Sequence, residues 1–214
     1  MNNIVEHTVK HYNSGNKIEE HKKDEIIQLY RDVFSADPWN YSSSVLGTKE
    51  IARELDFLTS DERGMIITVE KEEKVIGFRF VVKMEEVVAN SDSKLKPLFD
   101  WLINVMDTFP EKISFTQNLG VSQEYRGNGV SSILIEEHLK YAVESGCNYV
   151  LGWTSPKNDA MIRSYIKNGY SQITNLPENL RYGIDLGYVD GKPLFFRDDH
   201  IDDAVFYLKD LTRK

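Results

Sequence analysis

The chain has 214 residues, a net charge of −8 and a single cysteine. This length suffices for one domain with one hydrophobic core. The acidic balance argues against a nucleic-acid surface, which is usually basic. One cysteine excludes an intramolecular disulfide, so a cytoplasmic location is expected. We expect neither secretion nor membrane contact, because the N-terminus lacks a signal-peptide pattern and no apolar run could span a bilayer.

The N-terminal part predicts two helices after a polar segment. Residues 1–20 form either a flexible arm or an additional edge strand, and residues 21–214 form the main domain. Apolar residues at helical spacing predict a helix over residues 26–34 and a second over residues 48–58.

A β-hairpin and an inserted segment come next. Residues 65–70 and 74–82 predict two strands, and Glu85 stands at the end of the second. Within residues 87–112, an apolar face at helical spacing predicts an extra helix near residues 95–106. This helix either packs on the core or forms a contact in a homodimer.

A glycine-containing turn, residues 125–131, joins a predicted strand over residues 113–121 to a predicted helix. Such a turn directs several backbone N–H groups to one point, and the helix N-terminus adds a partial positive charge. Gly127 and Gly129 have no Cβ that would hold a ligand away from the backbone, and Arg126 supplies a full charge. The turn therefore predicts an anion site suited to phosphate. The alternative is an ordinary strand-to-helix connection.

The remaining chain predicts a strand, a helix and a final strand. The strand covers residues 148–154, helix-start signals follow at residues 155–159, and Gly169 ends that helix. The acidic run at residues 198–203 has the composition of a metal site. Consecutive carboxylates alternate faces on a strand, however, so we expect a solvated turn and no metal before the strand at residues 204–208.

Two signatures within residues 113–173 together resemble the GNAT superfamily of acyl-CoA-dependent N-acetyltransferases. The first is Arg/Gln-x-x-Gly-x-Gly/Ala, matched by Arg126, Gly129 and, with a serine as the one departure, Ser131. The second is Asn-x-x-Ala…Tyr-x-x-x-Gly-Phe/Tyr, matched by Asn158, Ala160, Tyr165, Gly169 and Tyr170. The resemblance implies a single α/β domain. Its central sheet would be mixed, mostly antiparallel, flanked by helices and splayed at the strand that binds the cofactor.

The resemblance also implies that acetyl-CoA (coenzyme A) is bound. Its pyrophosphate would be held by Arg126, Gly127, Asn128, Gly129, Val130 and Ser131. A backbone N–H among Leu119, Gly120 and Val121 would polarise the thioester carbonyl, and Gly120 would ease a local bulge. Asn158 would bind the cofactor, cap its helix, or do both. Tyr165 is implied as the general acid that protonates the coenzyme A thiolate.

The acceptor is less defined. Only about one primary amine in a thousand is neutral at pH 7, so a nearby base would help. Asp37, Trp39, Tyr41 and Glu85 are candidates for acceptor binding, and none is identified as the base. We expect acetyl transfer to the amine of a small molecule. The alternatives are a protein N-acetyltransferase and a non-catalytic acyl-CoA-binding or regulatory module. In this context the inserted helix could also be a lid over the acceptor site.

Overall fold

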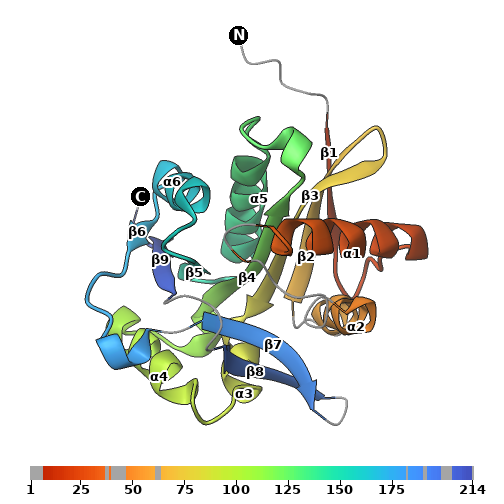
Figure 1. The fold of residues 1–214 in the computed structure, drawn as a ribbon. Helices are drawn as coiled ribbons and strands as arrows, with labels where there is room; N and C mark the ends of the chain where they lie inside the picture. The colour runs from red at the N-terminus through yellow and green to blue at the C-terminus, as the bar shows by residue number, and fades with distance from the viewer. Residues whose placement is uncertain are drawn as a thin grey trace. The chain divides into compact units, whose positions relative to one another are not determined.

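Seven strands form one mixed sheet in the order β1-β2-β3-β4-β5-β9-β6, and β7 and β8 form a separate two-stranded sheet (Figure 1). The structure is a computed structural model that describes residues 7–36, 39, 47–60, 64–181, 183–189, 192–198 and 204–213. β4 and β5 run parallel, whereas β1–β2, β5–β9 and β6–β9 are antiparallel pairs. The predicted α/β fold with a mixed, mostly antiparallel sheet is therefore confirmed.

The chain divides into two compact units. The first comprises Met1–Val81 and Gln117–Leu139, and the second comprises Val82–Thr116 and Lys140–Lys214. β3, β4 and α5 contribute residues to both units. The elements wholly or partly in the first unit are β1 (Thr8–Tyr12), α1 (Glu20–Phe34), α2 (Thr48–Thr59), β2 (Gly64–Lys71), β3 (Lys74–Lys83), β4 (Ile113–Val121), the 3-10 helix η2 (Gln123–Tyr125) and α5 (Val130–Glu144).

β3 is buried on both faces within the first unit. Phe78 and Phe80 stack against Tyr30 of α1, with ring centroids 5.7 and 5.8 Å apart. On the other face, Nε of Arg79 donates a hydrogen bond of 2.9 Å to Nδ1 of His138 in α5. Since successive residues of a strand point to opposite faces, α1 and α5 cover opposite faces of β3. This double burial explains why the β3 sequence is apolar almost throughout.

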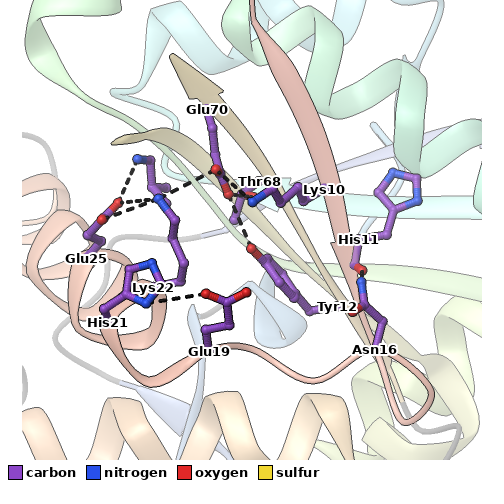
Figure 2. A network of polar contacts seen from close by, with 11 residues as sticks. Lys10, His11, Tyr12, Asn16, Glu19, His21, Lys22, Glu25, Thr68 and Glu70 are labelled. Atoms are coloured by element: carbon purple, nitrogen blue, oxygen red, sulfur yellow. Dashed lines mark hydrogen bonds and ion pairs between the residues drawn. The ribbon is translucent and has the colours of Figure 1, made fainter. Parts of the chain in front are cut away.

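A buried carboxylate, Glu70, links β1, β2 and α1 (Figure 2). Its side chain is 3% exposed and accepts a hydrogen bond of 3.2 Å from the Tyr12 hydroxyl. The ammonium groups of Lys10 and Lys22 lie 3.3 and 3.5 Å from its other oxygen, and Lys22 also pairs with Glu25. Burial, followed by the charge of Glu70, raises the pKa of Tyr12 to about 12. These contacts hold β1 in place as the outer strand beside β2.

The second unit contains α3 (Met84–Ala89), α4 (Lys96–Met106), η1 (Pro110–Lys112), β5 (Tyr149–Thr154), α6 (Asp159–Lys167), β6 (Ser171–Gln172), η3 (Glu178–Leu180), β7 (Gly183–Val189), β8 (Lys192–Asp198) and β9 (Val205–Asp210). The predicted extra helix is α4, and it buries Leu98, Phe99, Leu102 and Met106. The parallel pairing of β4 with β5 covers residues 113–115 of β4. The splaying of these strands stays a prediction.

The helix α3 corrects the predicted position of Glu85. β3 ends at Lys83, so Glu85 lies in the first turn of a helix and not at a strand end. Met84 and Val87 of α3 are fully buried, and the acidic first turn complements the positive helix N-terminus. Among the helices of the described residues, none has the length and apolar character needed to cross a membrane.

The β7–β8 hairpin is attached to the segment that follows α3 (Figure 1). The N–H of Phe195 donates to the carbonyl oxygen of Asn90 at 2.6 Å, and the N–H of Asp92 donates back to the carbonyl oxygen of Phe195 at 2.8 Å. Phe195 is fully buried. The inserted segment thus serves as the support for the hairpin within the second unit.

Candidate functional site

The turn after β4 has the backbone conformation that only glycine adopts easily. The φ angles of Gly127 and Gly129 are 79° and 86°, in the left-handed region. A Cβ placed on either glycine would meet no atom within 4 Å among the described residues. The side of the turn where a side chain would stand is therefore open to a ligand.

The helix α5 begins directly at the end of this turn. Val130, its first residue, is 5% exposed, which fixes the helix start on the core of the first unit. The carbonyl oxygen of Gly129 accepts hydrogen bonds from the N–H groups of Ser132 (2.9 Å) and Ile133 (3.1 Å). The first N–H groups of a helix have no acceptor within the helix itself. They give this end of α5 the partial positive charge that favours an anion.

Three polar residues of the turn lie next to the start of α5 in the sequence. Arg126 is exposed, and its Nε donates a hydrogen bond of 3.3 Å to the carbonyl oxygen of Val121 at the end of β4. Asn128 is exposed and its Nδ2 donates to the carbonyl oxygen of Arg126 at 3.4 Å. Ser131 is half-buried in the first turn of α5. The predicted residues of the turn thus lie together in one unit, in an arrangement able to bind an anion.

The predicted carbonyl-polarising residues form the last part of β4. Leu119 and Val121 are half-buried and Gly120 is buried. A Cβ on Gly120 would lie 2.5 Å from the ring of Phe78 and 3.2 Å from Val33. Close approach of these side chains therefore accounts for the glycine, and the expected bulge stays a prediction.

A carboxylate that no sequence motif identified lies beside the same strand. Glu54 of α2 is 6% exposed. Its Oε1 accepts hydrogen bonds from Nε2 of Gln117 (2.8 Å) and Nδ2 of Asn118 (2.9 Å). Gln117 is 8% exposed, and among the described residues its Oε1 has no hydrogen-bond partner. The available signal was a glutamate at helical spacing from Ile51 and Leu58, on the apolar face of α2.

Asn158 is the N-cap of α6 in the second unit. Its Oδ1 accepts a hydrogen bond of 3.1 Å from the N–H of Met161, and the side chain is half-buried. This bond satisfies one of the N–H groups that a helix start leaves without a partner. The capping role is confirmed, and the cofactor-binding role stays a prediction.

Tyr165 lies in the core of the second unit, with 1% of its surface exposed. Its ring stacks on Tyr207 at a centroid distance of 5.1 Å and is tilted against Tyr170 at 5.0 Å. A Cβ on Gly152 of β5 would overlap the Tyr165 hydroxyl. A side chain at position 152 is excluded because the ring of Tyr165 lies against the strand there. This contact orients the Tyr165 hydroxyl.

The candidates for acceptor binding are only partly described. Trp39 is half-buried, and its ring lies 5.7 Å from that of Phe34. Asp37 and Tyr41 lie outside the described residues. Glu85 is exposed in the first turn of α3 in the second unit. The acidic run before β9 lies mostly outside the described residues as well. Across the ranges that the structure describes, no group of three or more His, Cys, Asp or Glu residues could hold a metal ion.

Comparison with known proteins assigns the chain to a family. Residues 24–170, more than half of the chain, match the sequence model of the acetyltransferase (GNAT) family. The chain therefore belongs to the GNAT family of N-acetyltransferases. No curated protein matches its sequence significantly.

Solved structures share this fold at low sequence identity. NAA60 from Arabidopsis thaliana, solved in complex with acetyl-CoA, aligns with a TM-score of 0.62 at 16% identity, covering 97% of this chain and 99% of that one. The ribosomal-protein-alanine N-acetyltransferase from Brucella melitensis gives 0.62 at 14% identity, covering 95% and 99%. An N-acetyltransferase from Staphylococcus aureus gives 0.60 at 15% identity, covering 96% and 99%.

Proposed function

We propose that this chain transfers an acetyl group from acetyl-CoA to the primary amine of a small molecule, by direct attack of the amine on the thioester. The observation that carries the proposal is the turn between β4 and α5. Its two left-handed glycines have open space where side chains would stand, and an exposed arginine flanks them. A diphosphate fits this arrangement, because backbone N–H groups and a guanidinium are its usual partners in proteins.

The residues of the chain would divide the reaction as follows. Residues 126–131 hold the diphosphate of the donor. A backbone N–H among residues 119–121 polarises the thioester carbonyl as it gains negative charge. Tyr165 donates its proton to the departing thiolate, since a phenol with a pKa of roughly 10 is protonated at neutral pH. Asn158, the N-cap of α6, would also bind the cofactor.

A small-molecule acceptor is proposed because of two features, the inserted helix α4 and the loop after α1 that holds Trp39. An aromatic side chain in such a loop can receive a cation. A protein N-terminus is the alternative acceptor. A reducing cytoplasm, suggested by the single cysteine, is the proposed location.

The test is release of free coenzyme A thiol from acetyl-CoA, with a panel of small primary amines and short peptides. We expect release with at least one small amine. We expect Tyr165→Phe to lower kcat by roughly 100-fold, within the usual range for loss of a general acid. Tyr207→Phe is the matched control, because it removes a hydroxyl from the ring stacked on Tyr165.

Three results would contradict parts of this proposal. Release only with peptides would identify a protein N-acetyltransferase. Tight acetyl-CoA binding without release on any acceptor would favour a non-catalytic module. Equal kcat values for Tyr165→Phe and Tyr207→Phe would remove Tyr165 from the role of general acid.

A further inference from the structure

We propose that Glu54 and Gln117 bind the ammonium group of the acceptor, so that this enzyme selects a cationic primary amine. The inference rests on the proposed acetyl transfer and adds the acceptor-binding group to it. It uses two residues of the first unit that touch each other and that neither of the two motifs includes.

The contact between the two residues fixes the orientation of the amide. A carboxylate accepts hydrogen bonds only, so the Nε2 branch of Gln117 must face Glu54, in agreement with their 2.8 Å distance. The Oε1 branch of the same amide therefore points away from the carboxylate. Asn118 donates to the same carboxylate oxygen from the next position of β4. Two neutral amides thus fix the position of one carboxylate oxygen.

The cluster contains an acceptor that its own donors do not satisfy. Among the described residues, Oε1 of Gln117 has no hydrogen-bond partner although it is buried. A buried acceptor left in this way costs roughly 1–3 kcal/mol, so such atoms are rare without a reason. A ligand with a positive charge and several N–H donors would satisfy this oxygen and also attract the carboxylate. A primary ammonium group, with three N–H donors, has these properties.

The cluster also lies next to the residues that are proposed to polarise the thioester carbonyl. Gln117 and Asn118 directly precede Leu119–Val121, the residues proposed to polarise the thioester carbonyl. Each residue of a strand advances the chain by about 3.3 Å, so Gln117 lies about 7–13 Å along β4 from residues 119–121. Asn118 is half-buried whereas Glu54 and Gln117 are buried, so the strand becomes more accessible at Asn118.

The proton balance of the reaction gives Glu54 a second task. The bound ammonium ion passes one proton to the carboxylate, and the neutral nitrogen then forms a bond to the thioester carbon. The carbon–sulfur bond breaks, and the sulfur takes the proton of Tyr165. The second nitrogen proton returns to the tyrosine through solvent, and the carboxyl group of Glu54 then releases its own proton to solvent. The low exposure of Glu54 (6%) favours the first step, because desolvation lowers the pKa of an ammonium ion bound beside it.

The test compares wild type, Glu54→Gln and the matched control Glu50→Gln, an exposed glutamate in the first turn of the same helix. Thiol release gives kcat/KM for the best amine of the panel between pH 6 and 10. We expect Glu54→Gln to lower kcat/KM by roughly 100-fold at pH 7. The kcat/KM of this variant should then rise about tenfold per pH unit. The reason is that the fraction of neutral amine in solution rises by this factor up to the amine pKa near 10.4. The control should follow wild type, and the KM for acetyl-CoA should stay unchanged.

Calorimetric titration of the coenzyme A-loaded protein, with each amine and its matching alcohol, supplies a second readout that needs neither turnover nor a variant. We expect the amine to bind wild type at least tenfold more tightly than the alcohol. Equal binding of both, or an unchanged pH profile in a folded Glu54→Gln, would overturn the inference while leaving acetyl transfer intact. Amine-selective binding without thiol release would support the inference and contradict the proposed function.

Discussion

Replacing Gly129 by alanine separates the proposed ligand binding by the turn from the cost of the substitution to folding. The φ angle of Gly129 is 86°, so alanine must adopt the left-handed conformation there. This conformation costs a residue with a Cβ about 1–2 kcal/mol. The added methyl meets no atom within 4 Å, so no steric clash adds to this cost among the described residues.

The magnitudes follow from these two facts. A loss of 1–2 kcal/mol lowers the Tm of a chain of this size by about 2–8 °C, which leaves the fold intact. In the proposed function, the methyl would stand where the bound diphosphate approaches the backbone. The loss of one charge-assisted hydrogen bond, about 1.5–3 kcal/mol, corresponds to at least a tenfold weaker Kd for coenzyme A.

Gly146 provides the matched control, because it follows α5 with a φ of 71°, and a methyl group added there would likewise meet no described atom within 4 Å. Gly146→Ala should lower the Tm by a similar amount and leave the Kd unchanged. The assay is calorimetric titration with coenzyme A, together with thermal unfolding of both variants. Equal affinities of Gly129→Ala, Gly146→Ala and wild type would refute the assignment of the diphosphate to this turn.

Three further predictions concern stability and the tyrosine. Glu70→Gln leaves the buried ammonium of Lys22 with less counter-charge, and urea unfolding should show a loss of about 3 kcal/mol; a loss below about 1 kcal/mol would contradict this. Burial and a neighbouring guanidinium hold the pKa of His138 well below 6.5, so stability is fully present above that pH. As the pH falls below about 6.5, the unfolded chain binds a proton that the folded chain does not, and the free energy of unfolding should drop by up to about 1.4 kcal/mol per pH unit; His138→Gln should flatten this slope. Gly152→Ala should displace the Tyr165 hydroxyl and lower kcat more than it raises the KM for acetyl-CoA, and an unchanged kcat would argue against the tyrosine as general acid.

Local patterns were sufficient to predict most elements. The helical spacing of apolar residues predicts α1, α2 and α4, and the strand predicted at residues 113–121 coincides with β4. The strands predicted at residues 65–70 and 74–82 coincide with β2 and β3, and Glu72 and Glu73 between them have the positive φ angles of a tight hairpin. Each of these features is determined by residues close together in the sequence, so the sequence is sufficient to predict it.

Features that depend on distant residues were not predictable. The short helix α3 is stabilised by the burial of Met84 and Val87, and the hairpin β7–β8 is hydrogen-bonded to Asn90 and Asp92, about a hundred residues earlier in the chain. A short segment with two valines, such as α3, fits a strand or a helix equally well until tertiary contacts decide. Glu54 was missed for a similar reason. Nothing local reveals that a helix at residues 48–59 brings its carboxylate to Gln117 of β4.

The most direct test of the donor site follows backbone amide chemical shifts while acetyl-CoA is titrated into ¹⁵N-labelled protein. We predict the largest shifts at Gly127, Gly129 and the first residues of α5, with further shifts at residues 119–121. Saturable binding with unchanged shifts at the turn, and with the largest shifts elsewhere, would contradict the central claim that this turn holds the diphosphate of the donor.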